Sequence, residues 1–377
     1  MLSLYAHIPF CVRKCPYCGF FSTRYDPALA DRYLRALRED LAMNAPLLDG
    51  RPISTIYIGG GTPSTLSPAQ FTSLFDCLLG EAAGFSTGTE VSVEVNPGTA
   101  SPELFSRLRD LGVTRLSIGV QSLSDEVLCA LGRVHGAAEA RQTVAMARAA
   151  GFENIGLDLM YAVPGQTAGH WAETLDDALR LAPEHLSVYS LSIDEGSRFS
   201  DDACLGRLVL PSDEVAADLY SMACDRLERH GYRRYELSNF ARPGFTCKHN
   251  LNYWSHGEYL GIGAGAWSYL HGVRWANLCS VEGYIGRIAR RDPVRSFEER
   301  PSPAEAASEA LFLGLRTAEG VDLERFAACH GGERSASLLA AAERQWSTGL
   351  YEVHAGRLRL TQRGMLLADD AMLALLP

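Results

Sequence analysis

Three cysteines near the start of the chain, Cys11, Cys15 and Cys18, have a spacing that favours metal chemistry. Their C-x3-C-x2-C pattern lets a tight loop bring three thiolates to one metal centre, and thiolates are the usual ligands of a 4Fe–4S cluster. Zinc is the main alternative, with His7 as a fourth ligand, but Pro9 stiffens that link and no second CxxC pair follows. We therefore predict a cluster with one open iron, ahead of zinc or three unrelated buried thiols.

The composition describes a globular chain that is not built for polyanions. Its 377 residues are 47% hydrophobic, and the formal charge is 35 − 45 = −10, which argues against a nucleic-acid surface. Ten cysteines are too sparse for a disulfide scaffold, and a cluster loop needs reduced thiols. The first residues lack a basic signal-peptide region, and no apolar run reaches the length of a membrane span. These features predict a cytoplasmic protein.

The loop is expected at the end of the first of six strand–helix units. Helix start signals recur at Asp26-Pro27, Ser67-Pro68 and Ser101-Pro102, where a capping side chain precedes proline. Regular alternation of this kind predicts an α/β fold with a parallel sheet, whether open or closed into a partial barrel. The expected strands cover residues 2–8, 53–58, 91–95, 113–118, 155–160 and 186–191.

Polar residues gather at the C-terminal ends of these strands, where α/β proteins bind ligands. The turn of residues 59–63 (GGGTP) follows the second strand, and its glycines permit the backbone to approach a ligand closely. A tight turn with no ligand would have the same residues. Glu94 and Asp158 each alternate with apolar neighbours and should point into the lumen. Arg133 and ribose hydroxyls are plausible partners, and a structural ion pair would explain each carboxylate equally well. Gln121 is a weaker candidate.

The cysteine loop, with the aromatic Tyr17 before its last cysteine, resembles that of the radical S-adenosylmethionine superfamily. In that superfamily the open iron binds the amino and carboxylate groups of S-adenosylmethionine, which is cleaved to a deoxyadenosyl radical. The resemblance implies a partial (β/α)6 barrel, and it implies that the glycine turn binds the amino group of the cofactor.

Longer phrases resemble the coproporphyrinogen dehydrogenase branch of this superfamily, which includes oxygen-independent coproporphyrinogen III oxidases and HemW-type haem chaperones. The matching phrases are Tyr5-Ala-His-Ile-Pro-Phe-Cys, Ser117-Ile-Gly-Val-Gln-Ser and Asp158-Leu-Met-Tyr-Ala-Val-Pro-Gly-Gln-Thr. The resemblance covers nearly the whole chain and implies that S-adenosylmethionine is bound by Tyr5, Gly60, Gly61, Thr62, Glu94, Gln121, Arg133 and Asp158.

Within the branch, the resemblance favours a haem carrier over the oxidase. The oxidase has a further cysteine where this chain has Phe20, and it has an N-terminal arm ahead of the cluster loop. The H-N-x-x-Y-W motif typical of the chaperones is present as His249, Asn250, Tyr253 and Trp254. His249 is the leading axial ligand for haem iron, with Cys247 or Tyr253 as substitutes, and the aromatic rings can stack on a macrocycle. An aromatic segment that merely packs under the barrel is the alternative.

We expect three regions: the barrel over 1–240, the haem-motif segment and a linker over 241–300, and a C-terminal domain over 301–377. The stretch from Arg287 to Pro303 is charged and rich in proline, which is typical of linkers. Helices followed by an apparent hairpin at residues 350–360 suggest a mainly helical, winged-helix-like module. From residue 301 onward, seven arginines against ten acidic residues have the wrong sign for binding DNA.

The resemblance also implies partners. These are haem, apo-haemoproteins such as respiratory enzymes, an electron donor for the cluster, and transient contact with membrane proteins. Members of the branch usually carry histidine where this chain has Trp267, so we expect no comparable polar contact from that position.

Overall fold

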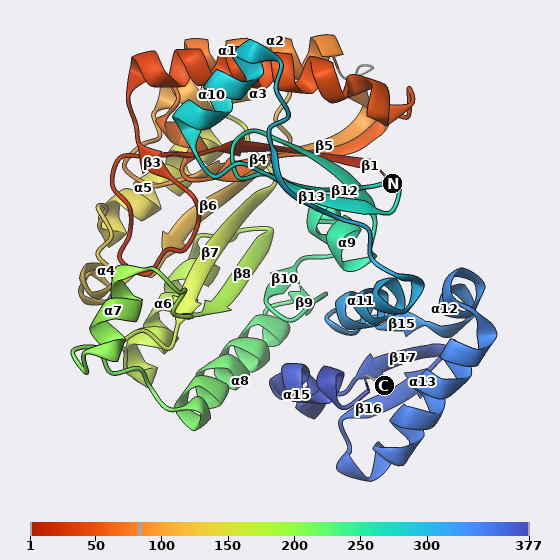
Figure 1. Ribbon diagram of the computed structural model, residues 1–377. Helices are drawn as coiled ribbons and strands as arrows, with labels where there is room; N and C mark the ends of the chain where they lie inside the picture. Colours follow the sequence, from red (N-terminus) through yellow and green to blue (C-terminus); the bar gives the residue numbers. More distant parts are fainter. Residues whose placement is uncertain (1, 82–84, 376–377) are drawn as a thin grey trace.

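The computed structural model describes residues 2–81 and 85–375. One large hydrophobic core extends from Leu2 to Val294, and a separate core extends from Ala307 to Leu375. Figure 1 shows the larger body with a layer of helices on its outer face and the smaller body at the lower right. The change of core after Val294 supports the proposed C-terminal domain.

The large body is built on six parallel strands. Each strand pairs in parallel with the next one along the chain, and parallel neighbours require a crossover that places helices on the outer face. This arrangement confirms the predicted α/β partial barrel. The strands are β1 (Leu2–Ile8), β4 (Ile53–Gly60), β5 (Phe85–Val95), β6 (Arg115–Gln121), β7 (Ile155–Tyr161) and β8 (His185–Ser190).

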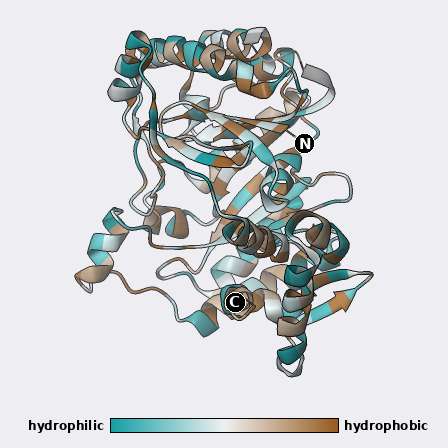
Figure 2. Ribbon diagram, turned by 45° about the vertical axis from the view of Figure 1, so that its right-hand side comes forward, coloured by the Kyte–Doolittle hydropathy of each residue, from teal (hydrophilic) through white to brown (hydrophobic). Residues whose placement is uncertain are grey.

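The covering helices begin where the sequence places their caps. The Asp26 carboxylate accepts a hydrogen bond from the Leu29 amide at 2.8 Å, and Ser101 caps the third helix in the same way. Figure 2 shows hydrophilic and hydrophobic residues alternating along these helices, as expected when one face packs on a core. The helices are α1 (Pro27–Asn44), α2 (Pro68–Glu81), α3 (Pro102–Asp110), α4 (Asp125–Ala130), α5 (Ala137–Ala149), α6 (Ala168–Arg180), α7 (Arg198–Cys204) and α8 (Asp213–Arg229).

The sheet continues beyond the six units, to twelve strands among the described residues. At one edge β10 (Asn239–Ala241) pairs antiparallel to β8, and β9 (Arg233–Arg234) pairs antiparallel to β10. At the other edge β11 (Glu258–Ile262) lies parallel to β1 and is followed by antiparallel β12 (Trp267–Leu270), β13 (Val273–Asn277) and β14 (Arg295–Glu299). Two further helices lie in this region, α9 (Lys248–Trp254) and α10 (Val281–Arg290).

The prediction of a linker from Arg287 to Pro303 is wrong, because this stretch contains the end of α10 and all of β14. Its prolines stand between elements or at the first position of the next helix, where a missing amide donor breaks no ladder. Charged residues on β14 suit an edge strand, which meets solvent on one side.

The C-terminal module confirms the predicted hairpin and the winged-helix-like order of elements. Three strands form its small sheet among the described residues, in the order β15-β17-β16. Its elements are α11 (Pro303–Leu315), β15 (Val321–Asp322), α12 (Leu323–His330), α13 (Gly332–Arg344), β16 (Tyr351–His354), β17 (Arg357–Leu360), α14 (Gln362–Leu366) and α15 (Ala368–Leu373). The module packs on the large body through α11, which contacts α9 (Figure 1). Within 2–81 and 85–375, no helix is long and apolar enough to cross a bilayer.

Candidate functional site

The cysteine loop leaves β1 and is held closed by a short parallel pair of strands. β2 (Phe10–Cys11) pairs with β3 (Thr23–Arg24), and the Tyr25 amide donates to the Cys11 carbonyl at 2.9 Å. The three thiols of Cys11, Cys15 and Cys18 are partly exposed on this loop. A closed backbone with open thiols is what a cluster-binding loop requires.

Two side chains from distant elements reach the thiols. Thr62 Oγ1 donates to Cys11 Sγ at 3.5 Å, and Arg133 Nη1 donates to Cys15 Sγ at 3.4 Å. A sulfur that binds iron can accept hydrogen bonds from donors such as these, so both contacts are compatible with a bound cluster. Donors of this kind also tune the potential of a bound cluster.

The donor set fits a cluster better than a zinc ion. His7, the candidate fourth zinc ligand, is buried, and its ring nitrogens contact the Tyr5 hydroxyl at 3.0 Å and the Phe21 carbonyl at 3.1 Å. In the described part of the chain, no three His, Cys, Asp or Glu side chains converge as they would on a single ion. In a cluster each thiolate binds its own iron, so convergence on one point is not needed.

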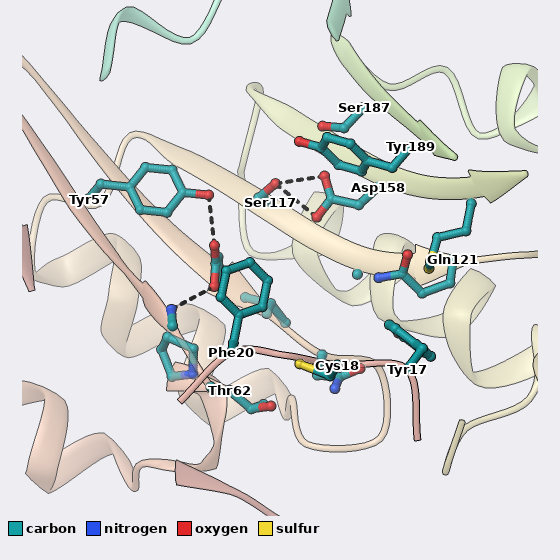
Figure 3. A pocket seen from close by; sticks show the side chains of 18 of the residues that line it. Tyr17, Cys18, Phe20, Tyr57, Thr62, Ser117, Gln121, Asp158, Ser187 and Tyr189 are labelled. Carbon is teal, nitrogen blue, oxygen red and sulfur yellow. Dashed lines mark hydrogen bonds between the residues drawn. The ribbon is translucent and has the colours of Figure 1, made fainter. Parts of the chain in front are cut away.

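A cavity of about 450 Å³ opens beside this loop, at the C-terminal ends of the strands. Figure 3 shows Phe20 and Cys18 on one side of it and Ser117, Asp158 and Tyr189 on the other. The predicted residues that line it are Gly60, Gly61, Thr62, Glu94, Gln121, Arg133 and Asp158. The structure thus brings together residues from β4, β5, β6 and β7, and from the segment after α4 that carries Arg133.

The glycine turn joins the loop to the cavity. Gly60 has φ +113°, a conformation that other residues rarely adopt. A Cβ on Gly61 would lie 2.8 Å from the Phe10 carbonyl oxygen and 3.0 Å from that of Ile8, so only glycine fits there. The Gly61 and Thr62 amides donate to these same two carbonyls. The turn is therefore fixed against the cluster loop by backbone contacts.

Glu94 points into the cavity, as its alternation with valines predicts. Its carboxylate accepts hydrogen bonds from the Tyr57 hydroxyl and the Gly60 amide, both at 3.0 Å (Figure 3). Burial raises the pKa of this carboxyl to about 7, and the negative charge of Asp158 adds to the effect. A positively charged ligand beside this buried carboxyl would favour its ionised form.

Asp158 also points into the cavity, and its carboxylate accepts from Ser117 Oγ at 3.1 and 3.3 Å. Burial raises the pKa of this carboxyl, while hydrogen bonds from Ser187 and Ser117 lower it. The expectation that Arg133 pairs with the carboxylates is not met, because both find closer donors. Arg133 instead donates to the Asn96 side chain, to the Gly119 carbonyl and to Cys15. It therefore links the cavity wall to the cluster loop.

Gln121 reaches the cavity through an irregularity at the end of β6. The register with β7 shifts between Ile118 and Gln121, and Gln121 has φ +65°. A bulge of this kind re-aims a side chain and is common beside functional sites. The amide of Gln121 is thus presented at the cavity edge next to Gly119.

The H-N-x-x-Y-W motif lies on α9, but its side chains do not line one common site. His249 is only 1% exposed; its Nδ1 contacts Thr55 Oγ1 at 2.9 Å and its Nε2 contacts the Tyr253 hydroxyl at 2.8 Å. Burial lowers the pKa of His249 to about 3. Iron ligation by this ring would require one of the two contacts to break.

The other motif residues separate. Asn250 lines the first cavity, and Tyr253 lines a second cavity that shares Phe20 with the first. Trp254 packs under the Arg316 guanidinium, 4.9 Å from the ring centre, beside the C-terminal module. Cys247, a substitute ligand by sequence, is buried, and burial raises the pKa of its thiol to about 12.

Comparisons with known proteins agree with this geometry. Residues 5–178 match the radical SAM superfamily, and residues 302–367 match the HemN C-terminal domain. The heme chaperone HemW of Bacillus subtilis is 39% identical over 100% of this chain and 99% of its own length. The HemW of Escherichia coli is 41% identical over 70% of this chain and 69% of its own. This chain belongs to the HemW family.

Among solved structures, the coproporphyrinogen III oxidase HemN of Escherichia coli, described as a radical SAM enzyme, superposes with a TM-score of 0.86. It is 26% identical and is matched over 100% of this chain and 90% of its own. Radical SAM proteins use a 4Fe–4S cluster and S-adenosylmethionine, so membership of this superfamily implies both cofactors for this HemW family member.

Several cavity residues of this HemW family member escaped the sequence reasoning. They share a signal that could have found them, which is polar residues at every second position of a buried strand. On β6 the residues Arg115 and Ser117 line the cavity, and on β8 so do His185, Ser187 and Tyr189. Tyr5, implied to bind S-adenosylmethionine, lines the second cavity instead. Trp267 also lines the second cavity and is 47% exposed.

Proposed function

We propose that this protein is a haem chaperone that holds a 4Fe–4S cluster and S-adenosylmethionine, binds haem, and delivers it to apo-haemoproteins such as respiratory enzymes. The single observation that carries the proposal is 39% identity, over essentially the whole of both chains, to the heme chaperone HemW of Bacillus subtilis. The protein would act in the cytoplasm. An electron donor would reduce its cluster, and the protein would contact membrane-bound haem acceptors transiently.

Residues of the loop and the first cavity would hold the two cofactors. Cys11, Cys15 and Cys18 would bind three irons, while Arg133 and Thr62 stabilise the thiolates. Glu94 and Asp158 would bind the positive charge and the hydroxyl groups of S-adenosylmethionine, because both carboxylates face the cavity. When bound, the reduced cluster supplies the electron that radical chemistry needs.

Oxygen-independent coproporphyrinogen III oxidase activity is the second candidate, favoured by the TM-score of 0.86 to HemN. The identity to that enzyme is 26%, against 39% to the chaperone. Phe20 stands where the oxidase has a further cysteine, and its side chain, 68% exposed, enters the first cavity (Figure 3). A phenyl ring cannot replace a thiol in proton or metal chemistry, so the chaperone is the better candidate.

Two assays decide between these functions. The cluster-loaded protein, charged with haem, is mixed anaerobically with a haem-depleted respiratory enzyme, and the recovered activity of that enzyme is measured. We expect recovery to exceed that given by an equal amount of free haem. The same preparation, incubated with coproporphyrinogen III, S-adenosylmethionine and a reductant, should yield no protoporphyrinogen. Stoichiometric conversion without haem transfer would overturn the chaperone assignment.

A further inference from the structure

A second cavity, of about 810 Å³, lies between the β11–β12 edge of the sheet and α11 of the C-terminal module. Its volume is within the range of sites that enclose small molecules and cofactors. No carboxylate of the first cavity lines it, and its wall is mainly aromatic. The aromatic lining residues among those described are Tyr5, Phe20, Phe21, Tyr253, Tyr259, Trp267, Tyr269 and Phe312.

This lining suits a large, flat, apolar ligand. Two of its rings are well exposed, Phe20 at 68% and Trp267 at 47%, although aromatic rings are usually buried when no ligand covers them. Trp267 lies beside Phe297, with ring centres 5.4 Å apart, so the exposed rings extend from the cavity along the sheet edge. Faces of this kind stack on a porphyrin.

One histidine in this cavity is arranged as a metal ligand. His256 Nε2 lies 3.4 Å from Glu309 Oε2, and its ring stacks on Tyr269 with centres 4.7 Å apart and planes 13° apart. A carboxylate that accepts a hydrogen bond from one ring nitrogen fixes the orientation of the ring. The other nitrogen then keeps its lone pair for a metal, which is the usual arrangement of ligating histidines. Burial lowers the pKa of His256, which keeps the ring neutral and able to bind iron.

The backbone of His256 supports the same assignment. His256 directly follows the cap of α9 and has φ +54°, a position that usually carries glycine. Its amide donates to the Tyr253 carbonyl, and the next amide donates to the Asn252 carbonyl, which completes the helix end. A histidine in this conformation costs free energy that its contacts with Glu309 and Tyr269 must offset.

The motif histidine has a different role here. His249 contacts the Tyr253 hydroxyl at 2.8 Å, and Tyr253 packs edge-on against Tyr259, with ring centres 4.6 Å apart. Both tyrosines line the second cavity, whereas His249 does not. His249 therefore holds the wall of the cavity in place.

Resting on the proposed chaperone function, we infer that haem binds in the second cavity with His256 as its axial ligand, and that His249 is a positioning residue for Tyr253. His7 also lines the cavity, but both of its ring nitrogens are occupied. Cys279 lines it as an exposed thiol and is the competing ligand.

The test is haem titration of the full-length, cluster-loaded protein, followed by absorption and resonance Raman spectra. His256→Gly removes the ring without straining the left-handed backbone, and His354→Ala, at an exposed position of β16, is the matched control. We expect His256→Gly to lose the imidazole-ligated spectrum and to weaken haem binding at least tenfold. Added imidazole should restore the spectrum. The control variant should match the wild type.

The remaining variants separate the alternatives. His249→Ala should keep imidazole ligation but weaken binding, and combining it with Tyr253→Phe should add nothing further. If His249→Ala alone abolishes imidazole ligation, or Cys279→Ser alone changes the spectrum, the assignment to His256 is overturned. If the wild-type protein binds no haem, the proposed function fails rather than the location of the site. Unchanged binding of S-adenosylmethionine in every variant checks that the first cavity is intact.

Discussion

Glu94 should make the binding of S-adenosylmethionine depend on pH in the neutral range. Burial, followed by the charge of Asp158, raises the pKa of the Glu94 carboxyl from 4.5 to about 7. The sulfonium charge of the ligand favours the ionised carboxylate, so a protonated Glu94 must lose its proton before tight binding. Because the pKa is raised, affinity is full above pH 7 and falls as the pH drops below it.

The magnitude follows from this pKa. Each pH unit below it costs about 1.4 kcal/mol, which is about tenfold in the dissociation constant. Between pH 8 and pH 6 we therefore expect binding to weaken about tenfold, and at pH 5 about a hundredfold, through this group alone. In Glu94→Gln the position no longer titrates, and the Gly60 amide loses the carboxylate that it bonds at 3.0 Å.

The assay is anaerobic equilibrium dialysis of cluster-loaded protein with S-adenosylmethionine at pH 6, 7 and 8. Dissociation constants are compared as the ratio of wild type to Glu94→Gln, since this ratio cancels the titration of the ligand's own amine. Glu126→Gln is the control. This substitution removes the same charge, and the Glu126 side chain is 77% exposed and lies outside the cavity. A ratio that stays constant from pH 6 to 8 would refute the assignment of Glu94 as the titrating contact.

Three further predictions follow from the site. Replacing all three loop cysteines by alanine should leave the anaerobically purified protein colourless, and iron and sulfide content near that of the wild type would contradict the cluster. Asp158→Asn should weaken S-adenosylmethionine binding by about 1–3 kcal/mol in calorimetry, because Ser117 then faces a neutral group and the ligand loses a charged acceptor. Gly61→Ala should cost about 1–3 kcal/mol through its contact with the Phe10 carbonyl, measured as a lower Tm with loss of iron, whereas Gly80→Ala in open space should not.

The amino-acid sequence alone determined the local chemistry of this protein. The C-x3-C-x2-C loop is fixed by covalent spacing, and helix starts are fixed by a capping side chain followed by proline. The sequence pattern correctly predicted that Glu94 and Asp158 point into the cavity, because side chains alternate between the two faces of a strand whatever surrounds it. Parallel pairing also followed, since strand–helix alternation leaves few other topologies.

Only the tertiary structure decided which side chains share a space. The partner of His249 on one side is Thr55, 194 residues away, so nothing near the motif shows that its imidazole is enclosed. The strand β14 is held by pairing with β13 at the edge of the sheet. Its own charges and flanking prolines do not reveal this contact, which is why they suggested a linker. The second cavity exists because α11 packs beside β11 and β12, from separate parts of the chain. Burial and hydrogen-bond occupancy depend on contacts distant in sequence, and these decide whether a histidine is free to bind iron.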